Sequence, residues 1–238
     1  MIDCIVALTT WRGRIFNDNL GRVLQRLCSQ ETRFNYKVVL SLSEEEFPKK
    51  NEELPTWLLD FTKTFENFEI LWSYRNTRSL KNYYPVKRKY NDIPIIVLGD
   101  DTIYSKNLVE FMMNEHLKTP DYALGNCLFY WDAAHDEIPV LCQVRLFPSA
   151  KCMFNLSELY FVEDFKNLEN DIFYGVCLKL QHTKCRGLNN KSLVVNAGFF
   201  GQENKLAFEY WKPENDPKKL YEEFVKKHPE LLEIIKEG

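Results

Sequence analysis

The chain has 238 residues, 45% hydrophobic and 27% charged, proportions that allow a sizeable buried core and exclude a disordered chain. Its formal net charge is −3, so it lacks the broad positive field on which non-specific nucleic-acid binding depends. We therefore expect one domain over residues 1–238 and no nucleic-acid partner.

The N-terminal segment and the cysteines both bear on location. An acid at Asp3 precedes an apolar run that is too short for a signal peptide or a membrane span. The seven cysteines form no CxxC pair, so we expect reduced thiols rather than disulfides or zinc ligands. These features predict a cytoplasmic protein. The lysine-bearing helix expected after Pro217 is either a solvated capping helix or a peripheral membrane contact.

In the first half of the chain, strand and helix signals alternate. Strands are expected at 4–8, 36–42, 68–73 and 93–98, a basic loop at 11–14, and helices at 16–27, 54–65, 79–90 and 106–116. Ser105 is the expected N-cap of the last helix. This alternation predicts an α/β fold with a doubly wound, mostly parallel sheet and helices on both faces. Ligands of such sheets bind at the carboxyl ends of the strands.

The second half is less regular. We expect strands at 122–124, 140–147 and 193–197, a largely helical segment at 155–190, and a final helix that Asp216 caps. No repeat or linker marks a domain boundary.

Two adjacent acids, Asp100 and Asp101, follow the most continuous β-branched run of the chain. Two carboxylates at a strand exit repel each other unless a cation or a hydrogen-bond network offsets their charge. Mg²⁺ and Mn²⁺ take one or two carboxylates and complete their shell with phosphate and water oxygens. The alternative is that the acids form a turn and cap the following helix.

Segment 95–105 contains an apolar strand, two acids, two further residues and an aromatic. It resembles the metal-site motif of GT-A-fold glycosyltransferases, specifically the family-two-like bacterial enzymes. The resemblance implies a GT-A-like fold, with Asp101 on a Mn²⁺ or Mg²⁺ ion and Asp100 on the ribose or in the metal shell. Gly99 stands where that family has a further acid.

The opening strand and the residues after it resemble the family's nucleotide-facing loop. The resemblance makes Thr9, Arg12 and Arg14 donor-binding residues, and the arginine fork suits phosphate because it can bind two oxygens. Lys81, in a segment similar to the family's lysine-bearing helix, is a further candidate. For these cations, ordinary solvated surface charge is the alternative.

The segment 169–174 reads Glu-Asn-Asp-Ile-Phe-Tyr and resembles the family's acidic pair before an aromatic-rich helix. By this resemblance Asp171 is the catalytic base, and Asn170 replaces the first acid. From the local pattern alone, Asp171 is an acid that the helix dipole favours. Glu163 and Asp164 are the reserve candidates for the base.

Four other side chains are weaker candidates. His135 and His182 could complete a metal shell, although a lone histidine is more often an ordinary partly buried side chain. Tyr130 and Trp131 could stack on an acceptor sugar, although core packing explains them as well.

Together, the motifs predict a glycosyltransferase with a nucleotide-sugar-binding half at about 1–125 and an acceptor half at about 126–238. It would move a sugar from a nucleotide-sugar donor, such as a UDP-sugar, to a glycan or lipid-linked acceptor, with metal assistance and inversion. A metal-dependent nucleotidyltransferase is one alternative, but the loop after the first strand holds a single glycine, Gly13. The other is a sugar-nucleotide-binding protein without turnover.

Overall fold

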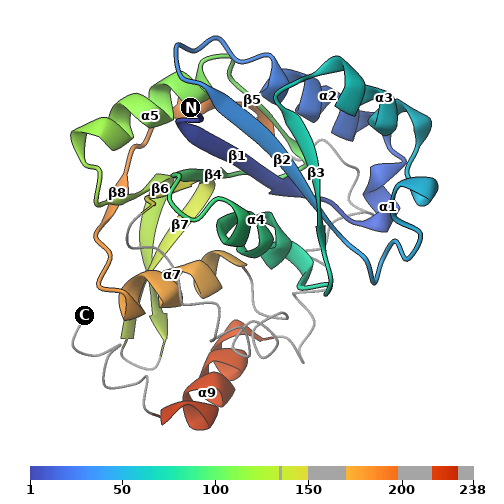
Figure 1. Cartoon of the computed structure of the whole chain (residues 1–238). Coiled ribbons are helices and arrows are strands. Elements are labelled where there is room, and N and C mark those ends of the chain that lie inside the picture. Colours follow the sequence, from blue (N-terminus) through green and yellow to red (C-terminus); the bar gives the residue numbers. More distant parts are fainter. Residues whose placement is uncertain (134–135, 150–169, 198–215, 230–238) are drawn as a thin grey trace.

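A seven-stranded sheet in the order β3-β2-β1-β4-β7-β6-β8 runs through the computed structural model, which describes residues 1–133, 136–149, 170–197 and 216–229 (Figure 1). The strands are β1 (Cys4–Thr9), β2 (Tyr36–Ser43), β3 (Phe68–Ser73), β4 (Ile95–Val97), β6 (Ala123–Ala133), β7 (Asp136–Phe147) and β8 (Cys185–Gly187). Strand β7 is antiparallel to both of its neighbours, and the other pairs are parallel. The expected α/β fold with a mostly parallel sheet is confirmed.

Helices cover both faces of this sheet, as the alternating pattern predicts (Figure 1). They are α1 (Arg12–Ile15), α2 (Asp18–Cys28), α3 (Thr56–Thr64), α4 (Tyr84–Lys89), α5 (Leu108–Lys118), α7 (Asn170–Leu180) and α9 (Pro217–Lys227). Short 3₁₀ turns are η1 (Lys50–Glu53), η2 (Arg78–Asn82) and η4 (Lys191–Leu193), and β5 (Thr102–Tyr104) pairs with β9 (Val194–Ala197) in a second sheet.

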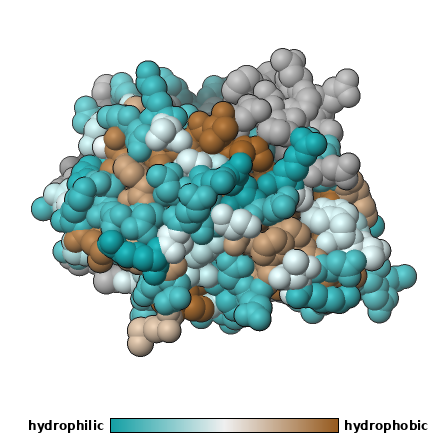
Figure 2. Space-filling model, turned by 90° about the horizontal axis from the view of Figure 1, so that it is seen from above, coloured by the Kyte–Doolittle hydropathy of each residue, from teal (hydrophilic) through white to brown (hydrophobic). Residues whose placement is uncertain are grey.

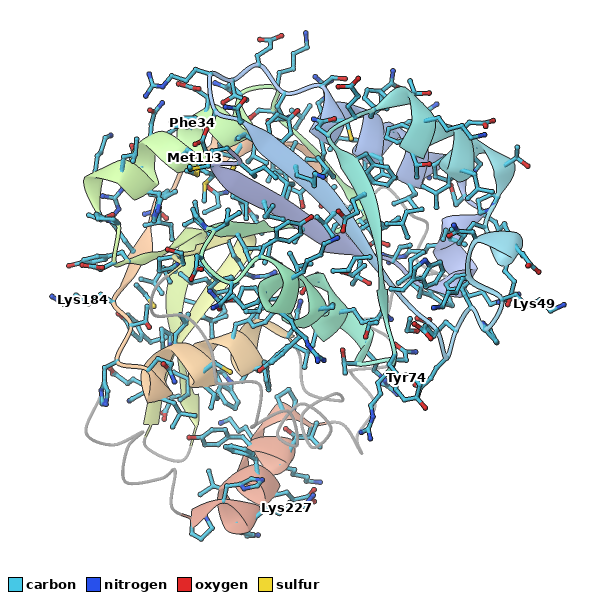
Figure 3. All side chains as sticks on the ribbon, viewed as in Figure 1. Phe34, Lys49, Tyr74, Met113, Lys184 and Lys227 are labelled. Carbon is cyan, nitrogen blue, oxygen red and sulfur yellow. The ribbon has the colours of Figure 1, made fainter. Side chains whose placement is uncertain are left out.

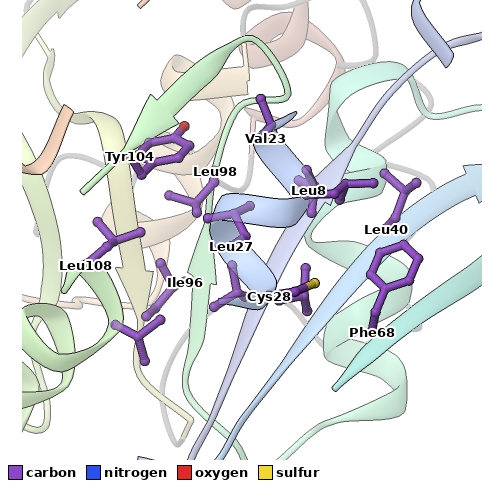
Figure 4. Close-up of a cluster of buried hydrophobic side chains, with 14 of the residues drawn as sticks. Leu8, Val23, Leu27, Cys28, Leu40, Phe68, Ile96, Leu98, Tyr104 and Leu108 are labelled. Carbon is purple, nitrogen blue, oxygen red and sulfur yellow. The ribbon is translucent and has the colours of Figure 1, made fainter. Parts of the chain in front are cut away.

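The core divides into two layers because successive strand residues point to opposite faces of the sheet. Leu8 of β1 and Ile96 of β4 belong to the layer under α2, α3 and α5, part of which Figure 4 shows. Ala7 and Val97 belong to the layer under α4, α7 and α9. Burying one such aliphatic side chain contributes about 1.5–3 kcal/mol, so these layers fix the ends of β1 and β4.

Two expectations about local structure are wrong. Ser105 does not cap α5: Asn107 is at the N-cap position, and the buried Ser105 hydroxyl has no hydrogen-bond partner among the described residues. The reason is that residues 102–104 continue as a strand paired with β9, which delays the start of the helix. The basic loop expected at 11–14 is also helical, as α1.

The second half departs further from expectation. The strand expected at 122–124 extends to residue 133, because β6 and β7 form a long antiparallel pair. In the segment expected to be helical, α7 ends at Leu180 and β8 follows, while residues 155–169 lie outside the described part. The Asp216 cap is confirmed, since its carboxylate accepts a hydrogen bond from the Lys218 amide at 2.9 Å.

The surface carries mixed side chains. Figure 2 shows hydrophobic residues in separate small areas among hydrophilic ones. In Figure 3, Lys49, Lys184 and Lys227 extend from the periphery of the ribbon, and Tyr74 is 77% exposed. Within the described ranges, no helix has both the length and the apolar character needed to cross a membrane. The described cysteines form no disulfide, and Cys152 lies outside the described residues.

Candidate functional site

The candidate site lies where β1 and β4 end side by side. These strands are parallel, with Ala7 opposite Val97, so the residues that follow each strand leave the sheet at the same edge. Thr10 and α1 follow β1, and the Asp pair follows β4. The packing of both strands in the core therefore brings Arg14 and the two acids together.

Asp100 is fully engaged within the protein. Its side chain is 10% exposed, the Arg14 guanidinium donates to Oδ1 at 2.5 Å, and the Thr10 hydroxyl donates to Oδ2 at 2.7 Å. Burial raises the pKa of Asp100, while the positive charge of Arg14 and the Thr10 hydrogen bond oppose that rise. Asp100 thus fixes Arg14, whose side chain is only 5% exposed, at the edge of the sheet.

Asp101 is the accessible acid of the pair. Its side chain is 34% exposed, and Oδ2 lies 3.7 Å from the Arg14 guanidinium. The Tyr104 hydroxyl accepts a hydrogen bond from the Gly99 amide at 2.9 Å, which closes the turn that carries Asp101. A Cβ atom on Gly99 would lie 3.0 Å from Asp101 Oδ1, so glycine leaves this carboxylate its space.

Arg12 and Thr9 do not join this cluster. Arg12 is exposed; it donates to Glu53 at 2.5 Å and to the Glu46 carbonyl at 2.8 Å. Thr9 ends β1 and donates to the Ser41 carbonyl of β2 at 2.7 Å. Thr9 therefore ties the end of β1 to β2, and Arg12 ties α1 to the segment after β2, on the side of the site away from β4.

Lys81 is buried rather than solvated. It is 1% exposed, and its ammonium donates to Glu46 at 2.7 Å and to Asn76 at 2.6 Å. Burial lowers the pKa of Lys81, and the charges of Glu46 and Asp100 counteract this. Since Asp100 acts on it electrostatically, Lys81 belongs to the same charged region, although its ammonium is already bonded.

Asp171 lies in the first turn of α7 and forms an ion pair with Arg145 of β7. Burial raises the pKa of Asp171, and the Arg145 charge opposes the rise. The β4–β7 register sets Arg145 opposite Val97, three residues before Asp100. Arg145, which pairs with Asp171, thus lies on the strand next to β4, and β4 leads to the Asp pair.

The weaker candidates are scattered. The Trp131 ring packs against Tyr221 of α9, with ring centroids 5.7 Å apart, as a partly buried side chain against the core. Tyr130 is 59% exposed, and His182 is an exposed residue with φ of 49° in the turn after α7. His135, Glu163 and Asp164 lie outside the described residues.

Sequence reasoning missed two residues of this region. Thr10, one residue beyond β1, holds Asp100, and its hydroxyl at a strand exit was the available signal. Arg145 is the cation in a strand that is otherwise mainly apolar, and a buried arginine requires an acidic partner.

A divalent cation fits this site only if the protein and the substrate share its coordination. No group of three or more histidine, cysteine or acidic side chains in the described ranges could hold a metal ion by itself. Each Asp100 oxygen already accepts a hydrogen bond in a buried position, so the partly exposed carboxylate of Asp101 is the more accessible ligand. Mg²⁺ and Mn²⁺ bind in this manner when substrate phosphates and water supply the remaining ligands.

Comparisons with known proteins identify the fold. No family model and no curated protein sequence matches the chain. Its structure is similar to that of S. aureus TarS 1-349, with a TM-score of 0.51 and 11% identity, over 82% of this chain and 60% of that one. The same protein in complex with UDP gives 0.51 and 9%, over 81% and 60%.

A cytidylyltransferase from Leptospira borgpetersenii aligns over 97% of both chains at 15% identity, with a TM-score of 0.46. The chain spans about 60% of the length of the TarS chains. At these identities the similarity to TarS shows the fold alone: an α/β fold with a mixed, mostly parallel seven-stranded sheet.

Proposed function

We propose that the protein is a metal-assisted glycosyltransferase that uses a nucleotide-sugar donor, for which a UDP-sugar is the first choice. The observation that carries the proposal is the different environment of the two adjacent acids. Asp100 accepts hydrogen bonds from Arg14 and Thr10, whereas Asp101 beside it is accessible. A diphosphate needs a bound cation and nearby positive charge; at this edge of the sheet Asp101 would hold the cation and Arg14 carries the positive charge.

In the proposed reaction, the donor diphosphate binds at the ends of β1 and β4, where Arg14 lies 3.7 Å from Asp101 and Asp101 would hold a metal ion shared with the phosphate oxygens. A metal ion held by Asp101 would offset the negative charge that builds on the departing nucleoside diphosphate. Asp171 accepts the proton of the acceptor hydroxyl as the oxygen bonds to the anomeric carbon. The bond from that carbon to the diphosphate oxygen breaks, and its electron pair leaves with the nucleotide, which inverts the anomeric configuration.

Two features favour glycosyl over nucleotidyl transfer. After β1 the chain forms the short helix α1, with Gly13 as its one glycine, in place of the glycine-rich, lysine-bearing loop usual in nucleotidyltransferases. Asp171 on α7 also supplies a carboxylate that can deprotonate an acceptor hydroxyl. Transfer of a nucleotide to a sugar phosphate needs no such base.

The test is release of nucleoside diphosphate from a panel of nucleotide sugars with Mn²⁺ or Mg²⁺ and mixed glycan and lipid-linked acceptors. Steady release that is lost in Asp101→Ala and retained in Asp60→Ala supports glycosyl transfer. Asp60 is the control because it forms an exposed ion pair with Lys63 on α3. Pyrophosphate release from nucleoside triphosphates and sugar phosphates would instead show a nucleotidyltransferase. Donor binding without any release would show a binding protein.

A further inference from the structure

Arg145 is the most heavily constrained charged side chain near the proposed base. It is 8% exposed on its side chain, and its Nε donates to the Leu141 carbonyl at 2.9 Å. Its guanidinium carbon lies 5.6 Å from the centre of the Tyr174 ring, and its terminal nitrogen donates to Asp171. These contacts leave the guanidinium a single direction, toward the first turn of α7.

The elements behind Arg145 are equally fixed. Helix α7 packs on β7 so closely that a Cβ atom on Gly175 would lie 2.1 Å from the Pro139 carbonyl oxygen. The Tyr174 hydroxyl bonds to Asn82 of η2, which anchors α7 to the region that holds Lys81. The position of Asp171 relative to the sheet is thus set by backbone packing, and its carboxylate orientation by Arg145.

We infer that Arg145 is a positioning residue for the proposed sugar transfer, because it holds the Asp171 carboxylate ionised and in one orientation at the first turn of α7. This inference rests on the proposed function. A base must be ionised to accept the acceptor proton, and a buried carboxylate without a cation favours its neutral form.

Other charges do not replace Arg145 within the described residues. The groups that act with it around Asp171 are Cys142 on β7, Cys127 next to it on β6, and Tyr174 on α7 itself. Burial and the neighbouring Cys127 raise the pKa of Cys142 to about 12, so this thiol is neutral at working pH. Arg145 is therefore the cation that keeps Asp171 charged.

The experiment compares Arg145→Gln and Arg145→Lys with the wild type, and Arg186→Gln is the matched control. Arg186 forms an ion pair with Glu115 of α5, on another part of the molecule. The first readout is the ¹³C titration of the Asp171 carboxyl in aspartate-labelled protein, identified by its absence in Asp171→Asn. The second is the pH profile of kcat/KM with the active donor.

For Arg145→Gln we expect the Asp171 titration and the acid limb of the profile to move together to higher pH. The activity ratio between the acid and neutral ends should fall by on the order of tenfold, because an adjacent opposite charge shifts a carboxyl pKa by about 1–3 units. Arg145→Lys keeps the positive charge and loses the planar guanidinium. The acid limb of its pH profile should therefore stay at the wild-type pH, and its kcat should fall by roughly tenfold to a hundredfold. Arg186→Gln should match the wild type.

An unmoved Asp171 titration in folded Arg145→Gln would overturn the inference. A titration that moves without the acid limb would equally overturn it, because Asp171 would not be the group that limits turnover. If Arg145→Gln does not fold, an Arg145→Lys variant with wild-type kcat would refute the positioning role. If no donor is turned over, the NMR titration still decides whether Arg145 holds Asp171 ionised, and the proposed function alone fails.

Discussion

The two adjacent acids should respond very differently to the same substitution. Asp100→Ala removes the carboxylate that accepts from Arg14 at 2.5 Å and from Thr10 at 2.7 Å, and both groups are buried. Loss of one partner of a buried ion pair costs about 3–5 kcal/mol. Because Asp101 remains 3.7 Å from Arg14, we expect the lower end, about 3 kcal/mol.

Asp101→Ala removes a carboxylate that is one-third exposed and makes two long contacts, with the Arg14 guanidinium at 3.7 Å and with the Thr102 hydroxyl at 3.4 Å. Exposed ion pairs contribute about 1 kcal/mol or less, so this variant should keep nearly all of its stability. In a protein of this size each kcal/mol changes the melting temperature by about 2–4 °C. Asp100→Ala should therefore melt about 6–12 °C below the wild type, and Asp101→Ala within about 4 °C of it.

The assay is thermal unfolding by circular dichroism at pH 7 without metal, with urea unfolding as a check on the free energies. Donor binding with Mn²⁺ should be lost in Asp101→Ala although that protein remains folded. Equal destabilisation by the two substitutions would refute the division of labour between these acids. So would a stable Asp100→Ala variant.

Three further predictions concern packing and pH. Gly99→Ala should weaken Mn²⁺-dependent UDP binding with little effect on stability, because its Cβ would crowd the Asp101 carboxylate; unchanged binding by calorimetry would contradict this. Gly175→Ala should destabilise the protein by about 1–3 kcal/mol, because the new methyl group meets a β7 carbonyl. Gly21→Ala in α2 has room for its methyl group and should stabilise the protein by about 0.5–1 kcal/mol. Urea unfolding of both variants distinguishes the two cases. Burial lowers the pKa of His116 below 6.5, so the unfolded chain binds more protons than the folded one, and stability should fall as pH drops below about 6.5. His116→Gln should reduce the dependence of the melting temperature on pH between pH 7 and 5. An unchanged pH dependence would refute this.

The sheet was largely predictable from sequence, because its central strands are continuous apolar runs. β3 has the expected bounds, and β1 and β2 each differ from expectation by one residue. β6 was underestimated because its outer half is partly exposed and gains its regularity from pairing with β7. Helix α1 was missed because a turn of four residues that includes Gly13 carries no periodic signal.

The chemistry was harder to predict, because it depends on register. The motif located Asp100 and Asp101, but their different roles follow from contacts made across the fold: Arg14 and Thr10, from the segment after β1, hydrogen-bond to Asp100, whereas the Asp101 side chain stays 34% exposed. The pairing of Arg145 with Asp171 requires β7 to run antiparallel beside β4 and α7 to pack on it. Nothing in the local sequence around either residue encodes that contact.

The most direct test of the account is a crystal structure with UDP and Mn²⁺, with the cation located by its anomalous signal. The proposed site predicts one Mn²⁺ peak within about 2.5 Å of an Asp101 oxygen, with diphosphate oxygens on the same ion and Arg14 beside them. Asp100 should keep its bonds to Arg14 and Thr10. A diphosphate bound elsewhere, with no ion at Asp101, would contradict the proposed site.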